Sequence, residues 1–236
     1  MASKPISIAV KRIKCVNETS EVGDDEPFVV VFAADITPEE IVPGKGFIPP
    51  RAAITVTGNW TDVNDGETHG TVPLPPVPDG VSENAFTPSV VWRKHCWGLA
   101  NGEAAPIDDP DNVILLVGMF EQDDGDIPNW RGTLGSLMTA ALAGSVNIKQ
   151  SRAALVGRLK QAFLDGVVTM RSFTPTAILN PDDIIGTVKE LHLTKDDLKK
   201  ARVGVHEREL EFKSDGAHYI VTFEMSPHDG HLHLPA

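Results

Sequence analysis

Carboxylates gather in three short segments of this sequence, and each segment lies beside an apolar stretch. Residues 20–26 precede the apolar run 27–36, residues 121–126 follow the apolar run 112–120, and residues 182–183 precede an Ile-Ile-Gly sequence. Hard divalent cations, calcium above all, need several carboxylate and carbonyl oxygens at once. We therefore predict a calcium site, and its candidate ligands are Glu21, Asp24, Asp25, Glu26, Glu121, Asp123, Asp124, Asp182 and Asp183.

The calcium hypothesis requires the three acidic segments to meet at one end of a sheet. Converging carboxylates are electrostatically costly without a cation, because like charges at close range raise pKa values or loosen the loops. Bound calcium would remove this repulsion. The alternative is that each segment is only a solvated acidic turn.

The elements that position these segments are mostly β-strands. Alternating or continuous apolar patterns predict strands at 6–16, 27–36, 51–60, 89–99, 112–120, 205–213 and 217–225. The runs 27–36 and 112–120 are the most continuously apolar, and the first of them suits a strand that is covered on both faces. Between Gly186 and residue 201 we expect a short strand and then a short helix, capped by Thr194 and Asp197.

The spacing of apolar residues becomes helical between Trp130 and Met170. We predict two helices joined near Asn147, which form a helical hairpin inserted at 128–172. Residues 132–148 carry no charge. The candidate residues for contact with a membrane or a partner are Trp130, Leu134, Leu137, Met138 and Leu142.

Predicted strands on both sides of the helical segment indicate one domain over residues 1–236. The predicted fold class is mainly β, an antiparallel β-sandwich with an inserted α-helical hairpin. Residues 226–236 contain three histidines and are expected to form a mobile His-rich tail. Zinc or nickel could use these imidazoles, although a terminal segment lacks surrounding residues to orient them.

The acidic segments and their strands resemble the calcium-dependent, lipid-binding β-sandwich called the C-two domain. In that family an acidic loop ends in an Asp-Pro-aromatic step into a strand, and residues 23–28 are similar to that step. A second acidic loop follows an apolar strand and closes with Asp-Asp-aromatic-Ile-Gly, and residues 112–126 and 182–186 are similar to its two halves. This sequence departs from the family in having Glu26 and Glu121 among the carboxylates and residues 127–181 between the halves. The resemblance implies a C-two-like sandwich that binds calcium and lipid.

We expect a binding module and not an enzyme, because no Gly-x-Ser-x-Gly elbow and no phosphate-binding glycine loop occur. Calcium would let an acidic protein engage phospholipid head groups or another anionic partner. The alternative function is a secreted, self-associating, toxin-like or effector protein. Such a protein would use the helical hairpin for membrane contact or for a homo-oligomer.

The net charge of −12 argues against a nucleic-acid partner, which would require clustered lysines and arginines. Residues 1–10 lack the features of a secretory signal, and no stretch suits a transmembrane helix, so the compartment stays open between cytoplasm and another export route. We expect Cys15 and Cys96 to be buried free thiols, with a disulfide as the alternative. Trp60 is expected at the surface because loop residues surround it.

Overall fold

The computed structural model describes residues 5–18, 26–37, 51–60, 63–70, 94–97, 107–121, 127–146, 150–173, 184–214 and 216–227. The strands within these residues are β1 (Ile6–Asn17), β2 (Pro27–Asp35), β3 (Arg51–Val56), β4 (Thr68–Gly70), β5 (Lys94–Trp97), β6 (Val113–Glu121), β7 (Lys189–Glu190), β8 (His206–Lys213) and β9 (His218–Pro227). The α-helices are α1 (Ile127–Val146), α2 (Arg152–Phe173) and α3 (Lys195–Ala201), and a 3₁₀ turn, η2 (Pro110–Asn112), precedes β6.

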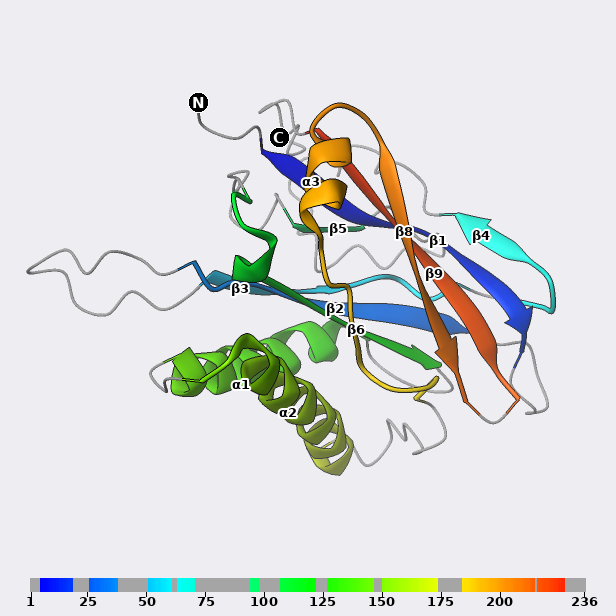
Figure 1. The fold of residues 1–236 in the computed structure, drawn as a ribbon. Coiled ribbons are helices and arrows are strands. Elements are labelled where there is room, and N and C mark those ends of the chain that lie inside the picture. The colour runs from blue at the N-terminus through cyan, green and yellow to red at the C-terminus, as the bar shows by residue number, and fades with distance from the viewer. Residues whose placement is uncertain are drawn as a thin grey trace, which may run out of the picture.

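The described strands form two antiparallel sheets (Figure 1). In the first sheet the order is β4-β1-β9-β8, and β5 pairs with the same side of β1 as β4 does. In the second sheet the order is β3-β2-β6-β7. The facing sides of the two sheets share one hydrophobic core, to which Val31, Val117, Val221 and Phe223 contribute. The mainly β, sandwich-like character that the sequence predicts is therefore confirmed.

The second sheet is covered on both faces. Every residue of β6 and all but the last residue of β2 are buried. One side of β2, for example Val29, packs toward the first sheet, and the other side, for example Phe28 and Phe32, packs toward α1 and α2. Burial on both faces explains why the runs 27–36 and 112–120 are apolar throughout instead of alternating.

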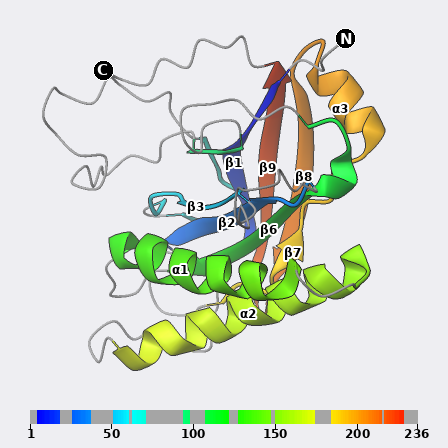
Figure 2. The same ribbon diagram turned by 90° about the vertical axis from the view of Figure 1, so that its left-hand side faces the viewer.

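Helices α1 and α2 form a third layer on the outer face of the second sheet (Figures 1 and 2). They follow β6 in the chain, precede β7 and pack against each other. Three phenyl rings link this layer to the sheet. The centroids of Phe28 and Phe120 lie 5.5 Å apart, and those of Phe120 and Phe163 lie 6.3 Å apart. The two predicted helices are confirmed.

Two glycines permit close packing in this layer. A Cβ atom on Gly118 of β6 would lie 2.7 Å from Phe120 Cε2 and 3.2 Å from Phe163 Cε1. A Cβ atom on Gly166 of α2 would lie 2.7 Å from Leu134 Cδ1 on α1. The absence of a side chain at these two positions therefore sets how near α2 comes to the sheet and to α1.

The C-terminal elements follow the sequence patterns closely. Strands β8 and β9 pair in register from His206 opposite Met225 to Lys213 opposite His218, as the predicted hairpin requires. Ser226 and Pro227, which the sequence assigns to the mobile tail, belong to β9, and Pro227 pairs with Ile6. Residues 228–236, which contain the three histidines, lie outside the described part of the chain.

Candidate metal centre

The residues next to the three acidic segments meet at one end of the second sheet. Pro27, at the start of β2, pairs with Glu121, the last residue of β6. Ile184, which follows the third acidic segment, forms a bridge with Phe120. The N–H of Ile185 donates to the carbonyl of Met119 at 3.0 Å. Antiparallel pairing thus brings the start of β2, the end of β6 and the chain at 184–185 side by side (Figure 1).

Two of the predicted ligands lie within the described residues, and both are at this end of the sheet. Glu26 is half-buried and directly precedes β2. Glu121 is 6% exposed and ends β6. The other predicted ligands lie outside the described part of the chain: Glu21, Asp24, Asp25, Asp123, Asp124, Asp182 and Asp183. Within the part that is described, no three His, Cys, Asp or Glu side chains are close enough together to hold a metal ion.

A fourth segment reaches the same end of the sheet. After β3, the N–H of Thr57 donates to the carbonyl of Val29, and the N–H of Trp60 donates to that of Pro27, both at 2.9 Å. Asn59 lies between these two anchor points, and its Nδ2 donates to Glu26 Oε2 at 3.0 Å. Asn59 also has an amide oxygen that is a suitable calcium ligand. Asn59 is not among the predicted ligands, because those residues are all charged oxygen donors.

The expectation that Trp60 lies at the surface is wrong. Its side chain is 3% exposed and belongs to the core between the two sheets. The loop-like residues around it misled the prediction, because the backbone bond to Pro27 folds this segment back along β2. The buried side chain of Trp60 and its backbone bond to Pro27 therefore hold the neighbouring Asn59 at this end of the sheet.

Most of the predicted contact residues of the first helix pack inside the protein. Leu134, Met138 and Leu142 are fully buried in the core that α1 and α2 share with the second sheet. Leu137 is 37% exposed, and the side chain of Trp130 lies outside the described residues. Leu134, Met138 and Leu142 could reach a membrane or a partner only if α1 left the sheet. No helix in the described part of the chain is long and apolar enough to span a membrane.

A buried carboxylate, Asp197, fastens α3 to β8. It forms the predicted capping box with Thr194, whose N–H and hydroxyl both donate to Oδ2 at 2.8 Å. His206 Nε2 donates to Oδ1 at 2.7 Å, and Arg208 donates to Oδ2. Burial raises the pKa of Asp197, but the hydrogen bonds from His206 and Thr194 and the charge of Arg208 outweigh it, so the pKa lies below its ordinary value. Because both carboxylate oxygens are engaged within the chain, we assign this cluster a structural role.

Both cysteines are buried and free, as predicted. The Cys96 thiol donates to the carbonyl of Ile8 at 3.4 Å. Burial raises the pKa of Cys96 to about 12, so its reactive thiolate form is scarce at neutral pH. Cys96 therefore does not suit nucleophilic chemistry.

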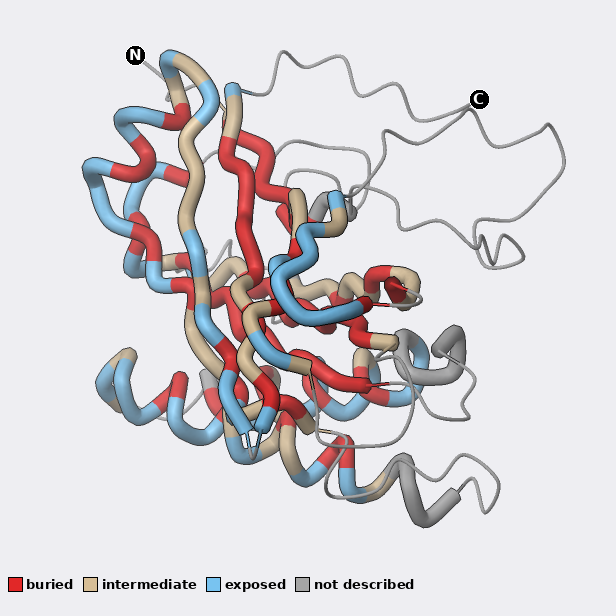
Figure 3. Tube along the Cα trace, turned by 90° about the vertical axis from the view of Figure 1, so that its right-hand side faces the viewer, coloured by how far each residue is buried: buried red, intermediate tan, exposed pale blue. Residues whose placement is uncertain are grey.

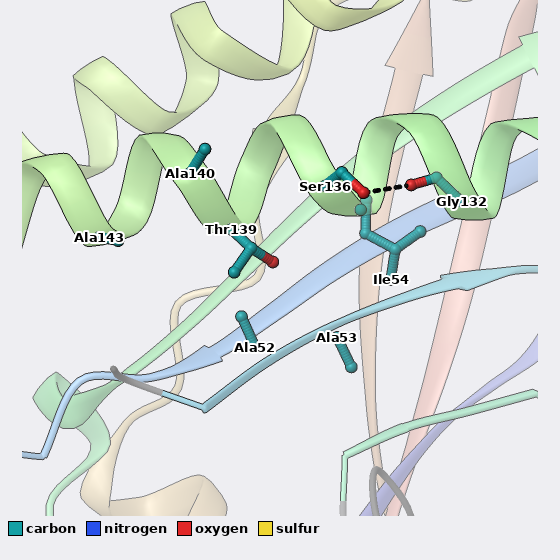
Figure 4. A pocket seen from close by; sticks show the side chains of 9 residues that line it. Ala52, Ala53, Ile54, Gly132, Ser136, Thr139, Ala140 and Ala143 are labelled. Atoms are coloured by element: carbon teal, nitrogen blue, oxygen red, sulfur yellow. Dashed lines mark hydrogen bonds between the residues drawn. The ribbon is translucent and has the colours of Figure 1, made fainter. Parts of the chain in front are cut away.

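A hollow of about 540 Å³ lies between α1 and the edge strand β3, and Figure 4 shows the residues that line it. Its lining consists of Ala52, Ala53, Ile54, Gly132, Gly135, Ser136, Thr139, Ala140 and Ala143. The lining carries no charge, and the Ser136 hydroxyl donates back to the carbonyl of Gly132 at 3.0 Å. A polar substrate would therefore find few anchors here, because specific small-molecule sites need convergent polar groups.

A second hollow, of about 790 Å³, lies where the start of α2 meets β7. Arg152 dominates it and donates to the carbonyls of Asp111 and Val113 at 3.0 and 2.8 Å. It also forms an ion pair with Glu190 at 2.6 Å. These contacts hold the start of α2 against the second sheet, and the charge of Arg152 is paired with that of Glu190.

Comparisons with protein-family models, with curated proteins and with solved structures found no match to this chain. A functional assignment therefore rests on the geometry. At the end of the second sheet, the described residues place two carboxylates, Glu26 and Glu121, and the amide of Asn59.

Proposed function

We propose that this protein is a calcium-dependent binding module with a C-two-like β-sandwich. The observation that carries the proposal is the meeting of Pro27, Glu121 and Ile184 at one end of the second sheet. Each of these residues adjoins or belongs to one of the acidic segments. The proposal requires each acidic segment to adjoin a residue at the same end of the sheet. The pairings of Pro27 with Glu121 and of Ile184 with Phe120 support this requirement.

The ligand chemistry favours calcium over softer metals. Calcium takes roughly six to eight oxygen ligands in a flexible arrangement, and the acidic segments offer carboxylates almost exclusively. Glu121 would supply a ligand from the sheet, and Glu26 would supply one from the residue that precedes β2. The Asn59 amide oxygen would add a neutral ligand while its Nδ2 orients Glu26. Ligands from the sheet would be held more rigidly than ligands from the loops.

In this proposal, α1 and α2 are a helical hairpin inserted between the two halves of the second acidic loop. The chain leaves the second sheet after Glu121 and pairs with it again at Ile184, beside Phe120. An insertion whose two ends are spatial neighbours lengthens a loop without disturbing the strands around it. The placement of both helices on the outer face of the sheet agrees with such an insertion.

Thermal unfolding in calcium, magnesium and a chelator tests the cation site. A ligand that binds only the folded protein stabilises it, by about 2.7 kcal/mol at a hundred times its dissociation constant. We expect the melting temperature to rise with calcium and to fall back when chelator is added. Superimposable curves up to millimolar calcium would remove the proposal.

Sedimentation with liposomes tests the partner. The net charge of −12 opposes binding to anionic lipid, so binding should require calcium, which reverses the local field. We expect cosedimentation with phosphatidylserine vesicles in calcium and none in chelator. Vesicle leakage that does not depend on calcium would instead favour the toxin-like alternative.

A further inference from the structure

The chain that follows β3 departs from the regular pairing with β2. The register of the two strands continues as far as Thr57, whose N–H donates to the carbonyl of Val29 at 2.9 Å. If this register continued further, Asn59 would lie opposite Pro27 and bond to it. The N–H of Trp60, one residue later, makes that bond instead, also at 2.9 Å. One extra residue therefore lies between the two bonds on the β3 side, which is the pattern of a β-bulge.

The faces to which the side chains point support the extra residue. Ile54 and Val56 of β3 pack toward α1 and α2. Successive side chains of a strand alternate between its two faces, so an unshifted residue 60 would point to the helical layer as well. Trp60 is instead buried in the core between the two sheets. A shift of one residue moves a side chain to the other face, so the bulge accounts for the burial of Trp60.

The hydroxyl of Thr57 takes the place of a backbone carbonyl in this bulge. In a regular ladder the N–H of Val29 would donate to the carbonyl of Thr57. Here it donates to Thr57 Oγ1 at 2.8 Å. Long buried stretches run through the interior of the molecule (Figure 3), and β2 is buried at every residue except its last. Because a buried N–H without an acceptor is costly, the 1% exposed Thr57 supplies the acceptor that this register requires.

Pro27 permits the shift at the other end of the bulge. A proline has no N–H, so Pro27 offers only its carbonyl to the neighbouring chain. The bond from Trp60 satisfies that carbonyl, and the change of register at this position costs β2 no donor. Thr57 and Trp60 are therefore both fixed to β2, and the two residues between them, Gly58 and Asn59, are held in the bulge.

The bulge determines where the side chain of Asn59 points. In the unshifted register it would share the face of the buried Thr57 and enter the interior. Asn59 is instead half-buried, and its Nδ2 donates to Glu26 Oε2 at 3.0 Å. Glu26 directly precedes β2. Thr57 therefore acts through the bulge on the contact between Asn59 and a candidate cation ligand.

We propose that Thr57 is a positioning residue of the cation site, because its hydroxyl holds the bulge that places the Asn59 amide beside Glu26. This inference rests on the proposed function, in which Glu26 and Asn59 bind calcium. The bond from Asn59 holds the Glu26 carboxylate in place before calcium arrives, and the amide oxygen of Asn59 is brought to the same place. Residues that orient ligands without touching the metal commonly control its affinity.

Calorimetric titration of calcium into threonine variants tests the inference. Thr57→Val keeps the shape of the side chain and removes the hydroxyl, and we expect it to raise the calcium Kd by roughly tenfold. Thr57→Ala removes the same hydroxyl and should show the same loss, which gives a second reading if the valine variant does not fold. Thr57→Ser keeps the hydroxyl and should bind calcium as the parent does.

Thr222→Val is the matched control. It makes the same change at a buried threonine of β9 in the first sheet, and the calcium Kd should not change. A cooperative melting transition without calcium establishes that each variant is folded.

A double-mutant cycle with Asn59→Ala separates positioning from a general loss of stability. If Thr57 acts through Asn59, Thr57→Val should weaken calcium binding no further once Asn59 is replaced by alanine. Equal losses in the two backgrounds, or an unchanged affinity in Thr57→Val, would overturn this inference and leave the cation site in place. A parent protein that binds no calcium would overturn the cation site and this inference with it.

Discussion

Ile184 forms a β-bridge with Phe120, although residues 121–183 separate them in the sequence. Ile185 extends the contact through its N–H, which donates to Met119. The chain therefore leaves the second sheet, builds both long helices and returns to the position where it left. The same junction places Ile184, which directly follows the third acidic segment in the sequence, at the end of the sheet that holds Glu26 and Glu121.

The described carboxylates of the candidate cation site give a direct test. Glu121→Gln removes one charge at the end of β6, and we expect the calcium-induced rise in melting temperature to fall by at least half. Asp196→Asn, at an exposed position of α3, is the control and should keep the full calcium response. An unchanged response in Glu121→Gln would remove this residue from the site.

Two glycines of α2 should respond oppositely to the same substitution. A Cβ atom at Gly166 would lie 2.7 Å from Leu134 Cδ1, whereas one at Gly157 meets nothing within 4 Å. We expect Gly166→Ala to lower the free energy of unfolding by about 1–2 kcal/mol, because overpacking outweighs the gain in helix propensity. Gly157→Ala should raise it by about 0.5–1 kcal/mol. Urea unfolding measures both, and equal effects would show that α1 and α2 are not packed as described.

The Asp197 cluster predicts a pH dependence of stability. The pKa of Asp197 in the folded protein lies below the ordinary value of 3.8. The ionised form is therefore favoured in the folded state, so its stabilisation is fully present well above pH 3.8 and is lost as the pH falls through the folded pKa.

Asp197→Asn should lower the free energy of unfolding at pH 7 by about 2–4 kcal/mol, because Arg208 loses its buried partner. The difference from the parent should shrink on acidification towards pH 3. Urea unfolding at pH 7, 5 and 3 measures it. A constant difference across this range would show that the ionised carboxylate is not the stabilising form.

The cysteines should be unreactive until the protein unfolds. Cys15 and Cys96 are both buried, and the pKa of Cys96 is raised to about 12. We expect a thiol reagent at pH 8 to label neither residue in the native protein and both in denaturant. Rapid labelling of Cys96 without denaturant would mean that β5 detaches readily from β1.

Local patterns in the sequence were sufficient for much of the fold. A continuous apolar run can be recognised without knowing what covers it, and for this reason the burial of β2 on both faces was predictable. Lys11 and Arg12, two adjacent charged residues within the predicted strand 6–16, lie where the pairing of β1 with β9 shifts its register. The capping box of Thr194 and Asp197 spans one helical turn, so its spacing alone indicated it.

Contacts between distant segments were not predictable in the same way. The pairing of Asp197 with His206 and Arg208 depends on how α3 turns back onto β8. The burial of Trp60 was not predicted, because its environment comes from β2 and not from its sequence neighbours. The calcium hypothesis required the chain to return near Phe120, but the contact of Ile184 with Phe120 could not be predicted. No local pattern in the sequence indicates where a long connection ends.

The position of the second sheet between two other layers has a consequence for folding. Its inner face needs the first sheet, and its outer face needs α1 and α2, so loss of either layer exposes a continuous apolar surface in water. Neither the strands alone nor the helical pair alone encloses a core that is complete. The described elements should therefore gain and lose their structure together, as one cooperative unit, although the sheets and the helices form separate layers.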